Sequence, residues 1–452
     1  MSESTPRRPL TAQRNGADNK LRRPIMAQRH DLEDFTDSPS APSPEQAAVN
    51  EPIAFSFTGK RGQLFKIALV NSLLTILTLG IYRFWAKTRI RRYFWSNIRI
   101  QNEPLEYTGT AMELLIGFLV VLAILVPIFA VYQGVLFLTS SSPEELHFSL
   151  QILYAVALLG FFQYAFYRMW RYRFSRTTWR SIRFSQAGSA WAYMGITLGW
   201  LVVTITTLGI AYPWLRHAQW QYRIKHMHFG EQAFTYSGRA RFLAKKWLVI
   251  LPIPFLLLTV LVVFQYQTLM TLMANFPPET PDRARQFNID FQELGWLASL
   301  VGLTFLAWPF LYVWYRIQEL NYIFGQSKFG DSGFRTSIRA SVLIGWFFAM
   351  LLGMIFFIGI PTGFVTYAIL TMGSQLHIPG IPTVALLIIG FVLILVATSI
   401  ISTVILTFGI TKHMFSNIQI TNPQSLMSVS QAKTGEPEFG EGLADALDVG
   451  AF

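Results

Sequence analysis

The sequence contains no cysteine among its 452 residues. It therefore cannot form disulfides, thiolate metal sites, iron–sulfur clusters or a cysteine nucleophile. Charged residues are also scarce, at 14% of the chain, against about 25% in an average soluble protein. No Asp, Glu, Lys or Arg occurs between Ala340 and Thr411, a run that no soluble fold of this size needs. Because a bilayer-spanning helix takes about 20 apolar residues, the sequence predicts an integral membrane protein.

Motifs for catalysis and metal binding are missing as well. The seven histidines form no HExxH pattern, and the close pair His226 and His228 lies in a basic segment without nearby carboxylates. No phosphate-binding glycine loop and no GxSxG motif occurs. No Asp or Glu lies in the middle of an apolar stretch, where such residues usually mark ion or proton pathways. We therefore expect no catalytic residue, no metal site, no cofactor and no enzymatic activity.

The two ends of the chain are polar. Residues 1–54 hold seven basic and eight acidic residues without an apolar period, so they predict a disordered tail without a cleavable signal peptide. Residues 423–452 predict a second, acidic tail. The net charge of +12 consequently belongs to the membrane part. We expect anionic lipid headgroups rather than nucleic acid as its partner.

An internal repeat is visible at an offset of 129 residues. Thr78-Leu79-Gly80-Ile81 matches Thr207-Leu208-Gly209-Ile210, and the match extends to Trp85 with Trp214 and to Tyr107 with Tyr236. A weaker third copy ends at 416–422, where SNIQITN resembles SNIRIQN at 96–102. We therefore divide the membrane part into repeat 1 at 55–183, repeat 2 at 184–333 and a divergent repeat 3 at 334–422.

The same residues carry a family resemblance. The string GQLFKIALVNSLLTILTLGIYRFWAKTRIRRYFW, preceded by FSFTGKRG, resembles the YjgN-like bacterial inner-membrane proteins. The resemblance covers about 53–422, and TLGIYRFWAKTR is its specific part. It implies a multi-pass plasma-membrane protein of uncharacterised activity, and it assigns no catalytic residue.

Eight apolar stretches predict an all-α polytopic fold with six to eight membrane segments. They lie at about 64–82, 114–137, 149–167, 190–212, 247–267, 294–315, 341–371 and 383–411. If all eight cross, the first and fourth stretches each separate two basic clusters, against the rule that basic loops stay cytoplasmic. If those two instead re-enter, six helices cross and both tails are cytoplasmic. Arg283 and Arg285 are then the only basic residues of the outer loops, which lie at 138–148, 268–293 and 372–382.

Two sets of residues are candidate sites. Uncharged polar residues and glycines in the two suspected re-entrant stretches are candidates for a permeation path or a hinge, although hydrogen bonds that pack helices together are the commoner role of such polar residues. They are Asn71, Thr75, Gly80, Thr204, Thr207 and Gly209. The basic, aromatic segments that follow are candidates for lipid-headgroup binding, or simply for interfacial anchors. They are Arg83, Trp85, Lys87, Arg91, Trp214, Arg216 and Arg223.

Two functions remain in competition. Repeats with glycine-interrupted segments favour transport or permeation of a small solute or lipid. The alternative is a non-catalytic membrane organiser that binds anionic headgroups or an envelope partner protein. A water-accessible polar stripe along the first and fourth stretches distinguishes them, because only transport requires it.

Overall fold

The computed structural model describes residues 51–264, 291–364 and 383–431, with the single positions 266, 270 and 367. Contacts divide the chain into Met1–Ala47 and Ala48–Phe452, and all described residues belong to the second unit. The expected N-terminal tail, the outer loops at 268–293 and 372–382 and the acidic tail therefore lie wholly or largely outside the described residues.

In the described part of the chain, eleven short strands form one antiparallel sheet, so the expectation of an all-α fold is wrong. The strands are β1 (Ile53–Phe57), β2 (Ile98–Ile100), β3 (Glu103–Pro104), β4 (Glu106–Tyr107), β5 (Thr177–Trp179), β6 (Ile182–Gln186), β7 (Met227–Phe229), β8 (Gln232–Tyr236), β9 (Ser327–Phe329), β10 (Ser332–Thr336) and β11 (Ile418–Thr421). They hold only 2 to 5 residues each, too few for a strand period to stand out beside long apolar stretches.

The sheet curves into a nearly closed ring. Its order is β3-β2-β1-β11-β10-β9-β8-β7-β6-β5-β4, so β3 and β4 are its two edges. These edges are separated by Leu105 alone, whose N–H donates to the carbonyl oxygen of Ile98 at 2.9 Å. At the other junction β1 pairs with β11, the first and last strands. The result is a near-closed ring without a long unpaired edge.

Helices are inserted between paired strands, which gives five units. In unit 1, α2 (Arg61–Leu77) and α3 (Arg83–Asn97) lie between β1 and β2. In unit 2, α4 (Ala111–Leu138) and α5 (Glu144–Ser175) lie between β4 and β5. In unit 3, α6 (Ala190–Thr206) and α7 (Tyr212–Lys225) lie between β6 and β7. Unit 4 places α8 (Ala240–Ile250), α9 (Pro252–Phe264) and α12 (Phe291–Gly325) between β8 and β9. Unit 5 places α13 (Ala340–Met354), the π-helix η1 (Ile355–Gly359), α15 (Thr383–Ile401), the π-helix η3 (Ser402–Thr407) and α16 (Phe408–Phe415) between β10 and β11. A short helix, α17 (Gln424–Met427), follows β11.

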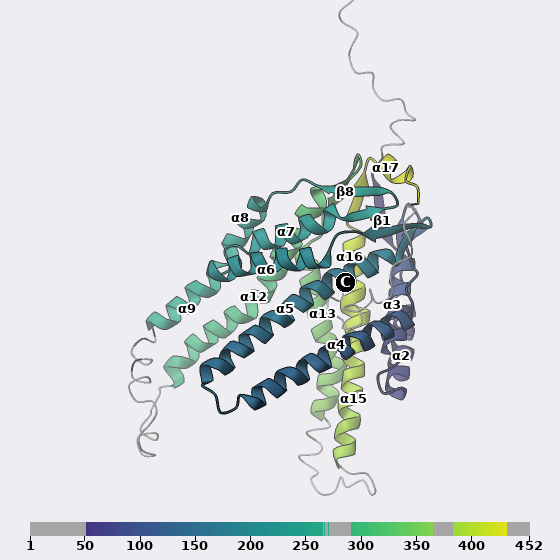
Figure 1. Ribbon diagram of the computed structural model, residues 1–452. Helices are drawn as coiled ribbons and strands as arrows, with labels where there is room; N and C mark the ends of the chain where they lie inside the picture. Colours follow the sequence, from purple (N-terminus) through teal and green to yellow (C-terminus); the bar gives the residue numbers. More distant parts are fainter. Residues whose placement is uncertain are drawn as a thin grey trace, which may run out of the picture. The chain divides into compact units, whose positions relative to one another are not determined.

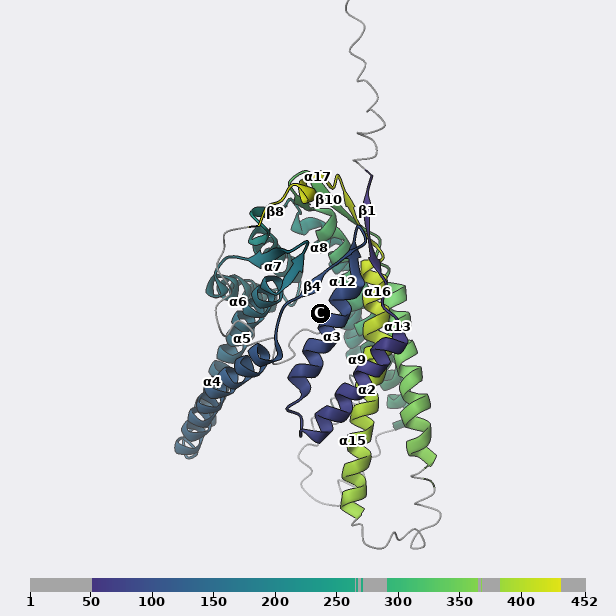
Figure 2. The same cartoon turned by 90° about the vertical axis from the view of Figure 1, so that its right-hand side faces the viewer.

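All five helical insertions leave from the same edge of the ring. The two strands of each unit are antiparallel neighbours, so the end of the first and the start of the second lie at one edge. Two-residue turns at the opposite edge join β2 to β3, β5 to β6, β7 to β8 and β9 to β10. The start of β1 and the end of β11 also lie at this turn edge. Figures 1 and 2 show the helices extending from one side of the strands.

The interior of the ring is packed with apolar side chains. Its core includes Trp179, Phe229, Phe329 and Ile420, each no more than 1% exposed. Leu426 of α17 joins the same core, so the segment after β11 closes the turn edge. Because side chains fill this space, the ring is a rigid base for the helices rather than a pore.

The helical insertions are of two lengths. Among the described residues, four segments are long and apolar enough to cross a bilayer, at Ala111–Leu138, Glu144–Ser175, Ala340–Phe364 and Ile388–Phe415. Other parts of the chain bury only 6% to 17% of the most apolar window of each. The insertions of units 1 and 3 are shorter, with helices of 17 and 15 residues and of 17 and 14 residues.

A recurring contact joins the two ends of a helical insertion where they meet the ring. We call this place the neck of the insertion. The Tyr93 hydroxyl donates to the carbonyl oxygen of Lys60 and accepts from its N–H, both at 2.7 Å. Tyr222 does the same with Ser189, and Tyr322 with Arg239. Each tyrosine stands five residues before the returning strand, and its partner directly precedes the outgoing helix. In unit 5 the equivalent position is occupied by His413, whose Nε2 accepts from the N–H of Arg339 at 3.1 Å.

Candidate functional site

The chain reverses direction at the TLG sequences of units 1 and 3. Gly80 N–H donates to the Thr75 carbonyl at 2.7 Å and Leu79 N–H to that of Ile76 at 3.0 Å, the bond pattern that ends many helices. The Thr78 hydroxyl donates to the Leu74 carbonyl at 2.8 Å and accepts from Tyr82 N–H at 2.9 Å. One side chain therefore closes α2 and opens α3.

Unit 3 repeats this turn. Gly209 N–H donates to the Thr204 carbonyl at 2.7 Å, and the Thr207 hydroxyl accepts from Ala211 N–H at 3.2 Å. The leucine and glycine have φ of 50° and 93° in unit 1 and of 51° and 89° in unit 3. Glycine adopts such angles without a steric penalty, which explains its presence at the second position. Gly80 and Gly209, the expected turn positions, both lie in these reversals.

The tips of these hairpins are apolar and exposed. Leu77, Leu79 and Ile81 are 79%, 95% and 59% exposed, and Leu208 is 73% exposed. Burying a leucine side chain is worth about 1.5–3 kcal/mol, so exposed tips of this kind favour insertion into an apolar phase.

The candidate path residues bond to backbone and to neighbouring helices. Asn71 is buried between α2 and α3, where its Nδ2 donates to the Ala86 carbonyl and its Oδ1 accepts from Arg89, both at 3.3 Å. The hydroxyls of Thr75, Thr204 and Thr207 donate to carbonyls four residues earlier in their own helices. The path candidates of unit 1 do not meet those of unit 3, because these two units are not neighbours in the ring.

The candidate headgroup residues differ in exposure, and only some of them lie at the surface. Arg83 and Trp85 are exposed near the start of α3, Lys87 and Trp214 are half-buried, and Arg91 is buried beside the Tyr107 hydroxyl at 3.4 Å. Arg216 is mostly buried and Arg223 is 7% exposed. Because α7 packs its polar face inward, these two arginines belong to an internal cluster rather than to the surface.

That cluster is organised around Glu319 of α12, which is 1% exposed. Its carboxylate accepts from Arg216 Nε at 3.0 Å, from Trp220 Nε1 at 2.6 Å and from Arg316 at 2.5 Å. Arg216 also donates to the Gln219 side chain at 2.6 Å. Burial alone would lower the pKa of Arg216, but the charge of Glu319 raises it above the ordinary value. Arg216 is therefore a permanent cation.

Arg223 lies two helical turns beyond Arg216 on α7, and its guanidinium lies over two indoles. Its guanidinium carbon is 3.9 Å from the ring centre of Trp170 in α5 and 4.3 Å from that of Trp220. Burial lowers the pKa of Arg223 to about 10, and the nearby Arg216 contributes to the decrease. The group stays charged at neutral pH.

We call Arg216, Arg223, Arg316, Glu319, Trp170 and Trp220 the arginine cluster. Arg216 and Arg223 are candidates from the sequence, whereas no motif in the sequence marks Arg316, Glu319 or Trp170 as part of a site. The available signal is the pairing of Glu319 with Arg316 three residues earlier, on one face of an apolar helix. Its partners on α5 and α7 become visible only in the folded chain.

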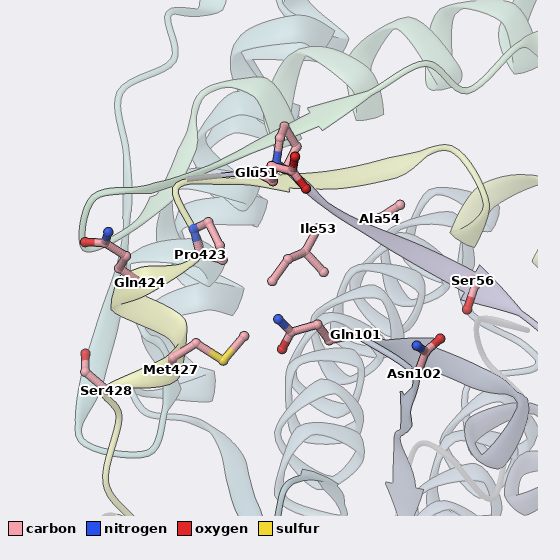
Figure 3. A pocket seen from close by; sticks show the side chains of 11 residues that line it. Glu51, Ile53, Ala54, Ser56, Gln101, Asn102, Pro423, Gln424, Met427 and Ser428 are labelled. Atoms are coloured by element: carbon pink, nitrogen blue, oxygen red, sulfur yellow. The ribbon is translucent and has the colours of Figure 1, made fainter. Parts of the chain in front are cut away.

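A shallow pocket lies at the turn edge of the ring (Figure 3). Its volume is about 780 Å³, and its lining comes from β1, the β2–β3 turn and α17, including Ile53, Gln101, Asn102 and Met427. Glu51 is its one ionisable lining residue. The described residues include no group of three His, Asp or Glu side chains placed to hold a metal ion.

Comparisons with known proteins identify the family but no activity. The family described as "Bacterial protein of unknown function (DUF898)" matches residues 52–377. The inner membrane protein YjgN of Salmonella typhimurium is 48% identical over 68 residues, which are 15% of this chain and 17% of that protein. The inner membrane protein YjgN of Escherichia coli K12 is 41% identical over 54 residues, which are 12% of this chain and 14% of that protein. The aligned stretches thus span less than a fifth of these relatives, and no solved structure matches the chain. Since the family match extends over most of the chain, the protein belongs to this DUF898 family, whose curated relatives are inner membrane proteins.

Proposed function

We propose that the chain is a multi-pass inner-membrane protein in which the insertions of units 2, 4 and 5 cross the bilayer and those of units 1 and 3 re-enter. The helix α4 holds 28 residues, about 42 Å at 1.5 Å per residue, which exceeds a hydrocarbon core of about 30 Å. In units 1 and 3 the chain turns back after 17 residues, and α3 then carries Arg83 and Arg91 toward the ring. Six crossings result.

In this topology the ring and both tails lie on one side of the membrane. Each insertion starts and ends at the same edge of the ring, so the chain returns to its starting side after every unit. Basic residues concentrate near that edge, which supports the cytoplasmic side. We further propose that the 129-residue repeat corresponds to one short and one long insertion, and that unit 5 is a long insertion alone.

We propose that the protein acts by binding rather than by catalysis, and that it holds anionic lipid headgroups around its ring. The observation that carries this proposal is a set of exposed basic residues at the necks of the insertions. This basic edge consists of Lys60, Arg61, Arg239, Arg241, Arg339 and Lys412. A basic residue near the membrane surface contributes about 1 kcal/mol to the attraction of anionic headgroups.

Transport is the competing proposal and has less support. A path for a solute needs polar side chains that face it and helices that enclose it. The threonine hydroxyls of the re-entrant stretches bond to their own helices, and the long apolar helices bury little of their surface against one another.

Cysteine scanning tests the topology, and the natural absence of cysteine makes it clean. Single cysteines at Leu79, Leu208 and positions along α2 and α6 are probed with membrane-impermeant thiol reagents from each side. We expect the ends of each short insertion to react from the cytoplasmic side alone. Reaction of Lys60 and Leu79 positions from opposite sides would show that α2 crosses.

Lipid retention tests the binding function. The double substitution Arg241→Gln/Arg339→Gln removes two charges from the basic edge, and Lys328→Gln/Arg335→Gln removes two exposed charges from the strands as a control. At about 1 kcal/mol per residue, the first variant should lose roughly 30-fold in affinity for phosphatidylglycerol and nothing for phosphatidylcholine. Equal lipid binding by both variants in native mass spectrometry would refute the role of the basic edge.

A further inference from the structure

The arginine cluster contains more positive than negative charge. Glu319 accepts hydrogen bonds from Arg216 and Arg316 and so uses both carboxylate oxygens. Arg223 has no carboxylate within ion-pair distance in the described part of the chain. Three guanidinium groups and one carboxylate give a local charge of +2. Burying an unpaired ion costs several kcal/mol, so a missing negative charge is indicated.

Buried donors on the three helices of the cluster, α5, α7 and α12, also have no acceptor. The Nε of Arg223 and the Nε1 of Trp170 are shielded from solvent and make no hydrogen bond, and the same holds for the Tyr315 hydroxyl. Arg223 is 7% and Tyr315 0% exposed. A buried donor without an acceptor destabilises the folded state. A ligand with several negatively charged oxygens would supply acceptors and charge together.

The position of the cluster fits a membrane headgroup. Trp170, Arg223 and Glu319 lie on α5, α7 and α12, which are the returning helices of units 2, 3 and 4. These units are consecutive around the ring. Arg223 lies in the last turn of α7, close to the neck, and therefore close to the level of the basic edge.

We propose that the arginine cluster is an anion site that takes a phosphate group, supplied by a lipid headgroup or by free phosphate. A guanidinium fork matches two phosphate oxygens in one plane, and the two indoles hold the Arg223 fork in a fixed orientation. The Trp170 Nε1 donates to the same group. This site is buried and separate from the exposed basic edge, so it does not depend on the function proposed above.

Thermal unfolding of the full chain in a non-ionic detergent tests the site. Phosphatidylglycerol, phosphatidylcholine or inorganic phosphate is added in increasing amounts to wild type, Arg223→Gln, Arg223→Lys and the control Arg335→Gln. A ligand of the folded state raises the unfolding midpoint as its concentration rises. We expect phosphatidylglycerol to raise the midpoint of wild type and Arg335→Gln, and phosphatidylcholine to leave it unchanged. Arg223→Gln should need about tenfold more of the ligand for the same shift, since a charge-assisted hydrogen bond is lost.

The remaining outcomes also decide the question. A shift with inorganic phosphate alone, abolished in Arg223→Gln, would assign the site to free phosphate. Arg223→Lys keeps a cation between the indoles but loses the fork, so an intermediate response supports the site even if Arg223→Gln folds poorly. If wild type responds to neither ligand, or if both Arg223 variants respond as wild type does, the cation has a structural role and the proposal is wrong. The basic-edge variant Arg241→Gln/Arg339→Gln should retain the Arg223-dependent shift, which separates failure of this site from failure of the edge.

Discussion

The glycine of the TLG turn offers the sharpest test of the re-entrant hairpins. Gly80 has a φ of 93°, and a Cβ atom built on it meets nothing within 4 Å. Its replacement by alanine therefore adds backbone strain without a steric clash. Gly199, in the middle of α6, also has nothing within 4 Å of a built Cβ atom, but its backbone is helical. The two substitutions are chemically identical and differ only in conformation.

The expected changes have opposite signs. Left-handed backbone costs an L-residue about 1–2 kcal/mol, so Gly80→Ala should lower the free energy of unfolding by that amount. Alanine in a helix is favoured over glycine by about 0.5–1 kcal/mol, so Gly199→Ala should raise it. Gly209→Ala should cost more than Gly80→Ala, because its Cβ atom would also lie 3.3 Å from Leu251 Cδ1.

Equilibrium unfolding in mixed micelles, followed by far-ultraviolet circular dichroism, measures these differences. The slope of the transition must be the same for all variants, so that the midpoints report stability alone. If Gly80→Ala is as stable as wild type, or if it is stabilised as Gly199→Ala is, Gly80 is not in a left-handed turn. The reversal of the first stretch would then be refuted.

Three further perturbations test other contacts, each by the same unfolding measurement. Tyr222→Phe removes the hydroxyl that bonds both backbone groups of Ser189 and should cost about 1–3 kcal/mol; an unchanged midpoint would contradict the neck contact. Glu319→Gln leaves Arg216 without its carboxylate and should cost about 3–5 kcal/mol; a stabilised variant would show that the pair is not buried as described. Burial lowers the pKa of His217 below its unfolded value of 6.5, so the unfolded state takes up the proton first and the protein loses stability as pH falls below about 6.5. His217→Asn should reduce that loss between pH 7.5 and 5.5, and an identical pH dependence would exclude a contribution from this group.

The sequence does carry a signal for the five units, although repeats of 129 residues conceal it. A glycine stands two residues before the first helix in four units, at Gly59, Gly109, Gly188 and Gly238, and unit 5 has Ile338 there. The 129-residue offset pairs Gly59 with Gly188 and Gly109 with Gly238. Each repeat of this length therefore contains two units. The expected repeat starts at 55, 184 and 334 fall within β1, β6 and β10.

By itself the sequence determined the membrane class, the apolar stretches and the two turns at Gly80 and Gly209. These depend on local properties, namely hydropathy over about 20 residues and the conformational freedom of glycine. Tertiary structure decided the rest. The strands are too short to stabilise themselves, and they pair only because five insertions return the chain to one ring. The same return brings Arg223 against Trp170 and Arg216 against Glu319, residues that lie 53 and 103 positions apart. Charge and burial in that cluster arise from contacts between units, which no local pattern encodes.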